Sequence, residues 1–154
     1  MTSRKDIDDF LGLKRVAVVG VSRNPKDFSR SLFRELRARG YDAVPVNPAV
    51  SEVDGVRCFA RLGDVTPPAG GALLMTSPSV TEEVVRECAA AQVGMVWMYR
   101  AVGAGAVSAS AVAYCREQGI RAIEGECLFM FLPNTGLPHR IHGFVRKLFG
   151  KYPS

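Results

Sequence analysis

The chain has few residues of the kinds that metal sites and covalent catalysis use most often. Its 154 residues include two histidines, four cysteines and one tryptophan, and no two cysteines form a CxxC pair. His139 and His142 both lie near the C-terminus, and their spacing from Cys127 matches no standard metal motif. We therefore expect neither a metal site nor a catalytic centre of its own.

Long apolar runs are also missing. No apolar segment approaches the roughly 20 residues that a membrane-spanning helix needs. The first six residues, Met-Thr-Ser-Arg-Lys-Asp, lack the apolar run of a secretory signal peptide. We expect a cytoplasmic protein with no membrane partner, in which the cysteines stay reduced.

The surplus of basic residues is modest. Twenty lysines and arginines against fifteen acidic residues give a net charge of +5, and the surplus is spread along the chain. Such a balance favours anionic ligands in general. Because the sequence has no RNA-binding aromatic motif, zinc finger or dense basic arm, we expect no nucleic-acid partner.

The sequence does contain a regular alternation of apolar, β-branched runs with helical patterns. Strands are predicted over residues 15–21, 42–46, 71–76, 95–99 and 120–124, with a short edge strand over 56–59. Helices are predicted over residues 3–11, 29–39, 60–65, 79–92 and 108–118. Short connections between alternating elements favour a parallel sheet. We predict an α/β fold: a Rossmann-like, doubly wound, mainly parallel sheet with helices on both faces.

Capping residues predict where some of these helices begin and end. Ser3 and Asp6 have the spacing of a capping box, and so do Ser79 and Glu82. Gly40 follows the second helix and is typical of a helix stop.

The chain reads as one domain, residues 1–154, because no linker, repeat or low-complexity segment divides it. From about residue 138 its tail has an amphipathic helical pattern, with Ile141, Phe144 and Leu148 among the residues on one stripe. We expect this tail to dock on the core or on another subunit. A homo-oligomer or an unknown protein partner therefore stays open. A membrane-surface role is the less favoured alternative, because the helix is short and its basic excess is modest.

The segment after the first predicted strand has the features of an anion-binding loop. An apolar run ends at Gly20, a polar turn follows, and a helical pattern opens at about Ser29. Backbone N–H groups, hydroxyls and the cations of Arg23 and Lys26 gather at that helix N-terminus, where an anion is favoured. The alternative is that both cations are solvated loop charges.

The ordinary nicotinamide fingerprint, GxGxxG, is missing from this loop. Asn47 ends the second predicted strand, where an NAD enzyme usually carries an acid that would repel a ribose phosphate. An adenine nucleotide with an extra ribose phosphate therefore suits the site, with Arg23 and Lys26 as its partners; CoA and NADP both fit. A side chain at Gly20 would occupy space that phosphate needs, so we expect Gly20→Val to weaken binding and leave the fold intact.

Several short motifs stand in a distinctive order. They are residues 18–25 (VVGVSRNP), residues 40–48 (GYDAVPVNP), Gly55, residues 96–98 (VWM) and Glu126-Cys127. In order and spacing, across about residues 7–132, this set resembles the small bacterial CoA-binding proteins, relatives of the CoA-binding domain of the succinyl-CoA synthetase α subunit. Family members commonly have Trp-Met-Gln and a glycine-containing turn at this point. Here Trp97 and Met98 are kept, and the Gln and the residues after it are replaced by residues 99–103 (YRAVG).

The resemblance implies CoA or an acyl-CoA bound along the carboxyl edge of the sheet. The residues implied around its phosphates are Gly20, Val21, Ser22, Arg23 and Asn24, with Lys26 and Ser29 as further contacts. Those implied on the adenosine side are Val46, Asn47 and Pro48. Ser77 and Pro78 would pass beneath the pyrophosphate or pantetheine, and Cys127 occupies the position of the family's cysteine.

Three functions fit these features. The leading one is a CoA-binding module without catalysis, and the others are an NADP-dependent oxidoreductase or redox sensor and a scaffold that has lost its ligand. The missing GxGxxG disfavours the second, and the retained Gly20, Ser22, Arg23 and Asn47 disfavour the third. Cys127 reads either as an activated thiol beside the coenzyme or as a buried apolar side chain.

Overall fold

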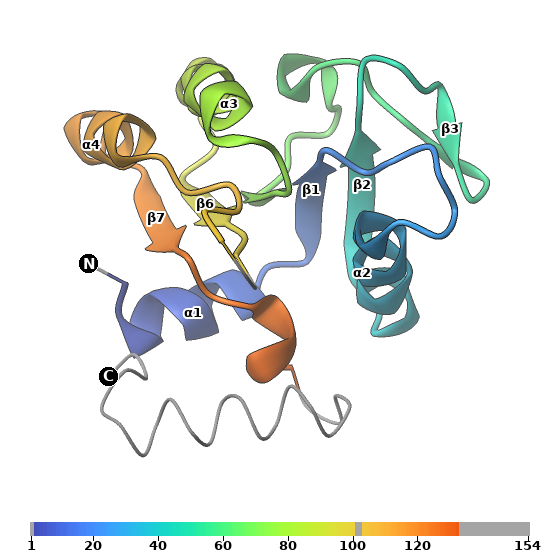
Figure 1. Ribbon diagram of the computed structural model, residues 1–154, viewed down its shortest axis with the longest axis horizontal. Coiled ribbons are helices and arrows are strands. Elements are labelled where there is room, and N and C mark those ends of the chain that lie inside the picture. The colour runs from blue at the N-terminus through green and yellow to red at the C-terminus, as the bar shows by residue number, and fades with distance from the viewer. Residues whose placement is uncertain (1, 101–102, 133–154) are drawn as a thin grey trace.

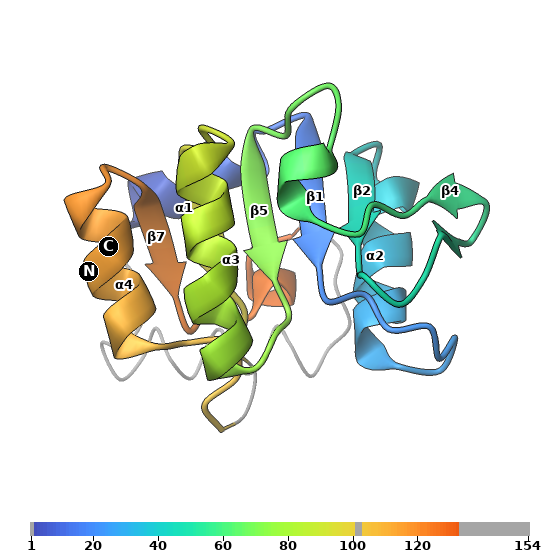
Figure 2. The same cartoon turned by 90° about the horizontal axis from the view of Figure 1, so that it is seen from above.

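A five-stranded sheet forms the centre of the computed structural model, which describes residues 2–100 and 103–132. Its strands are β1 (Arg15–Val19), β2 (Asp42–Val46), β5 (Gly71–Leu74), β6 (Met95–Met98) and β7 (Arg121–Glu124). All are parallel, in the order β2-β1-β5-β6-β7, which Figure 1 and Figure 2 show from two sides. The predicted α/β, Rossmann-like, parallel sheet is confirmed.

Helices cover both faces of this sheet (Figure 2). Helices α1 (Arg4–Leu11) and α2 (Phe28–Ala38) lie on one face with the short turn η2 (Leu128–Met130). Helices α3 (Pro78–Ala90) and α4 (Ala109–Glu117) lie on the other with η1 (Leu62–Asp64). Because parallel strands joined by crossover helices are buried on both faces, their sequences are nearly continuous apolar runs.

The apolar side chains of the strands point alternately to the two helical layers. Trp97 packs toward α1 and Met98 toward α3 and α4, and both are fully buried. The indole N–H of Trp97 donates to the carbonyl of Glu126 at 2.9 Å, so its polar atom is satisfied inside the core. Trp97 and Met98 therefore belong to the core.

The first capping prediction is confirmed. The Ser3 hydroxyl accepts the Asp6 N–H at 3.1 Å, and the Asp6 carboxylate accepts the Ser3 N–H at 3.2 Å. Helix α2 begins at Phe28, with Asp27 as its N-cap, one residue earlier than the pattern indicates. Gly40 follows this helix with φ +90, the conformation that a glycine stop supplies.

The predicted capping box at Ser79 and Glu82 is wrong. Helix α3 begins at Pro78, with Ser77 in the N-cap position. Proline suits the first helical position because its φ is already helical and its missing N–H has no intrahelical partner there. The Glu82 carboxylate instead accepts the hydroxyl of Ser108 at 2.6 Å, which ties α3 to the start of α4.

The predicted edge strand over residues 56–59 is confirmed only in part, because its first two residues pair elsewhere. Strands β3 (Glu52–Val53) and β4 (Val56–Arg57) form a separate antiparallel hairpin, and only Phe59 bridges to the main sheet, beside Val46. The turn of the hairpin is Asp54-Gly55, with φ of +48 and +79. Two successive residues of positive φ suit a tight hairpin turn, so the chain doubles back on itself before it reaches the sheet.

The predicted tail helix from about residue 138, with His139 and His142, lies outside the described residues. Among the helices of the described ranges, none is long and apolar enough to cross a membrane.

Candidate functional site

The order of the strands creates a crevice at one edge of the sheet. From β1 the chain runs through α2 to β2 on one side, and it later returns to β5 on the other side of β1 (Figure 2). The crossovers from β1 and β5 therefore lie on opposite faces, and their first residues diverge at the carboxyl ends of these strands. Open α/β sheets bind ligands at such a switch point. Here Gly20 follows β1, and Met75 and Thr76 follow β5.

Gly20 lets these two strand ends approach each other closely. Its φ is +93, and a Cβ built on it would lie 2.6 Å from the Met75 carbonyl oxygen. Its N–H donates to the Val46 carbonyl at 2.9 Å. A side chain here would strain the backbone and collide with a neighbouring strand end. The expectation that Gly20→Val leaves the fold intact is therefore wrong.

A cleft opens between this switch point and helix α3, with a volume of about 260 Å³. The residues lining it are Val19, Gly20, Val46, Asn47, Pro48, Ala60, Arg61, Thr76, Val80, Glu83, Val84 and Glu87. It therefore collects four of the predicted site residues: Gly20, Val46, Asn47 and Pro48.

The remaining walls of the cleft were not predicted. Arg61 comes from the segment after the β3–β4 hairpin, whose sequence pattern is unclear. Val80 and Val84 form one i,i+4 pair on α3, and Glu83 and Glu87 form another. Because residues four apart lie on the same face of a helix, this spacing in the sequence could have predicted that one face of α3 lines the cleft.

The loop after β1 is shaped by its own polar side chains. The Ser29 hydroxyl accepts the Ser22 N–H at 2.9 Å and donates to Asp27 at 2.6 Å. The Ser22 hydroxyl accepts the Asn24 N–H at 3.1 Å, and the Asn24 side chain accepts the Lys26 N–H at 3.0 Å. The hydrogen bonds from Ser29 lower the pKa of Asp27. Ser29 is buried, so its hydroxyl holds the loop together from inside.

Arg30 of α2 holds the backbone of the loop after β1 through hydrogen bonds. It is buried, and its guanidinium donates to the carbonyls of Ser22 at 3.3 Å and Arg23 at 3.2 Å. A second nitrogen of the same group donates to the Asp54 carboxylate in the hairpin turn. The loop, the helix and the hairpin are therefore joined through one side chain.

Arg34, one turn further along α2, completes this connection. It donates to the Asp54 carboxylate at 2.8 Å and to the Pro25 carbonyl at 3.1 Å. Hydrogen bonds from Arg34 and Arg30 lower the pKa of Asp54 to about 2. On sequence alone both arginines look like surface charges of an amphipathic helix, and only the hairpin turn reveals their partner.

Arg23 and Lys26 are exposed on the loop and do not line the cleft. Neither forms an ion pair with any residue in the described part of the chain. Their charges therefore remain available to an anion that reaches the loop.

Asn47 braces the loop against the end of β2. Its side-chain amide donates to the carbonyl of Val21 at 2.8 Å, and its oxygen accepts the Ala49 N–H at 2.8 Å. Val21 is fully buried, so it contributes backbone rather than side chain. Asn47 thus shapes the cleft that it also lines.

Ser77 and Pro78 begin helix α3 and lie beside the cleft without lining it. Thr76, immediately before them, does line it. The Thr76 hydroxyl lies 2.7 Å from that of the fully buried Thr81, which fixes its orientation. Thr76 was not among the predicted site residues.

Cys127 is buried, and its sulfur lies 3.6 Å from the Tyr99 hydroxyl. Burial raises the pKa of Tyr99. The exposed ring of Phe28 packs against Tyr99 and Phe129, with ring centroids 5.6 and 5.7 Å apart. Cys127 therefore lies beneath an aromatic cluster at the carboxyl edge. Within residues 2–100 and 103–132, no three potential metal ligands come together.

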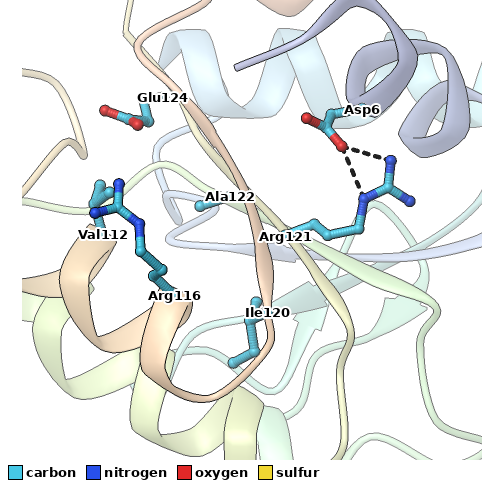
Figure 3. Close-up of a pocket in the computed structure, with 7 residues that line it drawn as sticks. All are labelled: Asp6, Val112, Arg116, Ile120, Arg121, Ala122 and Glu124. Atoms are coloured by element: carbon cyan, nitrogen blue, oxygen red, sulfur yellow. Dashed lines mark hydrogen bonds and ion pairs between the residues drawn. The ribbon is translucent and has the colours of Figure 1, made fainter. Parts of the chain in front are cut away.

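A second hollow, of about 150 Å³, lies along β7 at the far edge of the sheet (Figure 3). Its lining residues are Asp6, Val112, Arg116, Ile120, Arg121, Ala122 and Glu124. Arg121 donates to Asp6 at 2.8 Å on one side of this hollow. None of the predicted site residues lines this hollow, so the cleft beside α3 is the candidate site.

Comparison with known protein families assigns the chain to a family. Residues 14–133 match the CoA binding domain family, and the chain belongs to that family. The matched residues include the loop after β1, both walls of the cleft and the carboxyl ends of all five strands.

Individual relatives share the fold or part of the sequence. A 55-residue stretch is 36% identical to uncharacterized protein YneT of Bacillus subtilis (strain 168) and spans 36% of this chain and 41% of that protein. A hypothetical protein from Pyrococcus horikoshii OT3 is 26% identical, with a TM-score of 0.76 over 82% of this chain and 87% of its own. The dinucleotide-forming acetyl-coenzyme A synthetase 1 of Ca. Korarchaeum cryptofilum is 23% identical, with a TM-score of 0.64 over 73% of this chain and 26% of its own. At that identity the likeness shows the fold alone.

Proposed function

We propose that this protein binds CoA or an acyl-CoA at the carboxyl edge of its sheet, without catalysis of its own. One observation carries the proposal. The segment that matches the CoA binding domain family contains a cleft at the topological switch point, and this cleft collects Gly20, Val46, Asn47 and Pro48.

The adenosine part of the ligand would occupy the cleft. Val46 and Pro48 on one side and Val80 and Val84 on the other offer apolar surfaces to the faces of the base. Thr76 adds a hydroxyl whose orientation is fixed. A largely apolar pocket with a few oriented polar groups is typical of a nucleotide site.

The pyrophosphate would cross Gly20 toward the N-terminus of α2. The partial positive charge of that helix end favours an anion, and the exposed Arg23 and Lys26 add two full charges. The Ser22 hydroxyl and the Asn24 amide remain as donors. Ser29 supports them from within the loop, because its hydroxyl bonds the Ser22 N–H.

The pantetheine arm would then pass Ser77 and Pro78 and reach the edge near Tyr99. The thiol of Cys127 lies at the same edge of the sheet, where it is buried and contacts the Tyr99 hydroxyl. A buried thiol that packs as a small apolar side chain supports binding rather than covalent chemistry.

Isothermal titration with CoA, acetyl-CoA, NADP and NAD tests this function. We expect saturable binding of CoA with one ligand per chain, tighter than NADP and much tighter than NAD. The double variant Arg23→Gln/Lys26→Gln should weaken CoA binding by about tenfold or more, because each charge-assisted contact contributes on the order of 1.5–3 kcal/mol. Arg116→Gln on α4 is the control for net charge. Tighter binding of NADP than of CoA would favour an oxidoreductase or redox sensor instead.

A further inference from the structure

The charged residues that line the cleft are of both signs. Glu83 and Glu87 project from α3. Arg61, which follows the β3–β4 hairpin, also lines the cleft and lies beside Glu87. Among the described residues that line the cleft, Arg61 is the only one with a positive charge. A phosphate placed in this cleft is therefore repelled by the two glutamates and attracted only to Arg61.

Arg61 is held only loosely by its own protein. Its side chain is 71% exposed, and its Nε lies 3.9 Å from the nearest Glu87 oxygen, beyond hydrogen-bonding distance. The other Glu87 oxygen accepts the Leu62 N–H at 3.0 Å, so the carboxylate has a backbone partner of its own. The guanidinium can therefore turn toward a ligand at the cost of a weak, solvated ion pair.

CoA carries three phosphate groups, and they lie in two places. Two form the pyrophosphate, and the third is attached to the ribose next to the base. If the base lies between Pro48 and Val80, the ribose phosphate stays at the cleft, whereas the pyrophosphate leaves it past Gly20. Arg23 and Lys26, the cations to which the sequence assigns the extra phosphate, do not line the cleft.

Given the CoA function proposed above, we infer that Arg61 binds the ribose 3′-phosphate and thereby sets the preference for CoA over dephospho-CoA. Arg23 and Lys26 then serve the pyrophosphate. Arg61 is suited to its role because a guanidinium forms two parallel hydrogen bonds with a phosphate. The Glu83 carboxylate, which also lines the cleft, is compatible with the exocyclic amine of adenine, because that amine is a donor.

The test compares dissociation constants for CoA and dephospho-CoA, with adenosine 3′,5′-bisphosphate and AMP as a second pair that lacks pantetheine. The wild type should prefer the 3′-phosphorylated ligand of each pair by about tenfold or more. In Arg61→Gln this ratio should fall toward one, because affinity for the 3′-phosphorylated ligand drops and affinity for the other does not. Arg23→Gln should weaken both CoA and dephospho-CoA and keep their ratio, and Arg116→Gln should change neither.

The outcomes separate this inference from the function on which it rests. A wild-type protein that binds CoA and dephospho-CoA equally, or an Arg61→Gln variant that keeps the wild-type ratio, overturns the role of Arg61 and leaves CoA binding intact. If only Arg23→Gln abolishes the preference for CoA over dephospho-CoA, the ribose phosphate binds at the loop after β1 and not at Arg61. No binding of CoA by the wild type removes the proposed function itself. Because Arg61 is exposed, its replacement should leave the melting temperature nearly unchanged.

Discussion

Two features of Gly20 require a glycine: its positive φ and its close approach to the end of β5. Gly40 shares the first feature and lacks the second, so the two can be separated. Gly20 and Gly40 have nearly the same backbone angle, with φ of +93 and +90. A Cβ at Gly40 would meet nothing within 4 Å, whereas one at Gly20 would lie 2.6 Å from the Met75 carbonyl oxygen. A side chain introduced at Gly40 would therefore cause backbone strain alone, whereas one introduced at Gly20 would cause the same strain and a collision.

Gly40→Ala should therefore cost about 1–2 kcal/mol of unfolding free energy, the usual penalty for a left-handed alanine. Gly20→Ala should cost about 2–5 kcal/mol, because a crowding penalty of about 1–3 kcal/mol adds to the same strain. Chemical denaturation of the two variants measures both. Equal losses would contradict the close approach of Gly20 to the end of β5.

The four thiols should react slowly in the native protein. All four cysteines are buried. Burial raises the pKa of Cys115 to about 11 and also raises the pKa of Cys58 and Cys88. Titration with a disulfide reagent at pH 8 should show slow release, with four equivalents only after addition of guanidinium. If one thiol of the folded protein reacted quickly, and this rapid reaction were absent in Cys127→Ser, Cys127 would instead be an activated cysteine beside the coenzyme.

At the scale of elements, Asp54 couples the β3–β4 hairpin to the loop that leads into α2. Its carboxylate accepts hydrogen bonds from Arg34 and Arg30, and Arg30 in turn holds two loop carbonyls. Asp54→Asn keeps the positive-φ turn, because asparagine tolerates it, but removes the charge. We expect a loss of about 1 kcal/mol in stability, since the carboxylate is 30% exposed and partly screened by water.

This loss should depend on pH in a defined direction. The two arginines lower the pKa of Asp54 to about 2 from an ordinary value of 3.8. Stability from the ionised carboxylate is therefore fully present above about pH 4 and disappears as the pH falls toward 2. The free energies of unfolding of wild type and Asp54→Asn should differ at pH 6 and converge near pH 2. Glu35→Gln, which breaks the ion pair of this α2 residue with Arg39 just after the helix, is the control. A difference that persists at pH 2 would show that the charge of Asp54 is not its cause.

The sequence predicts these elements better than it predicts their ends and pairings. Strands β1 and β6 stand out because parallel strands are apolar throughout. The start of α3 was misplaced because Ser79 has the spacing of a cap, whereas Pro78 already supplies the first helical residue. The pairing of residues 56–59 was missed because Asp54-Gly55 turns the chain into a local hairpin, and two-residue strands carry almost no pattern.

For the whole molecule, the alternation of strands and helices predicts the sheet, and the sheet places the site. Gly20 and Asn47 could be assigned to one edge because both follow predicted strands, and parallel strands bring their carboxyl ends together. Arg61 could not be assigned in this way, because its position depends on the hairpin before it. The same holds for Arg30, whose partner Asp54 lies 24 residues away in that hairpin.

Ligand binding should stabilise the whole molecule in proportion to affinity. A ligand that binds only the folded state at 100 times its dissociation constant adds about 2.7 kcal/mol. CoA should therefore raise the melting temperature by several degrees, and dephospho-CoA at the same concentration should raise it less. Arg61→Gln should remove the difference between the two ligands. Equal shifts in the wild type would contradict recognition of the ribose phosphate.

CoA that occupies the cleft beside α3 and crosses the carboxyl edge at Gly20 should change the surroundings of the backbone amides along that path. A ¹⁵N-resolved NMR titration of the full chain with CoA measures this, because each backbone amide reports its own surroundings. We expect the largest shifts at Gly20, Asn47, Thr76 and the loop after β1, with little change along β7. Shifts concentrated at the hollow around Arg121 and Glu124, with Gly20 and Thr76 unmoved, would contradict this placement of CoA.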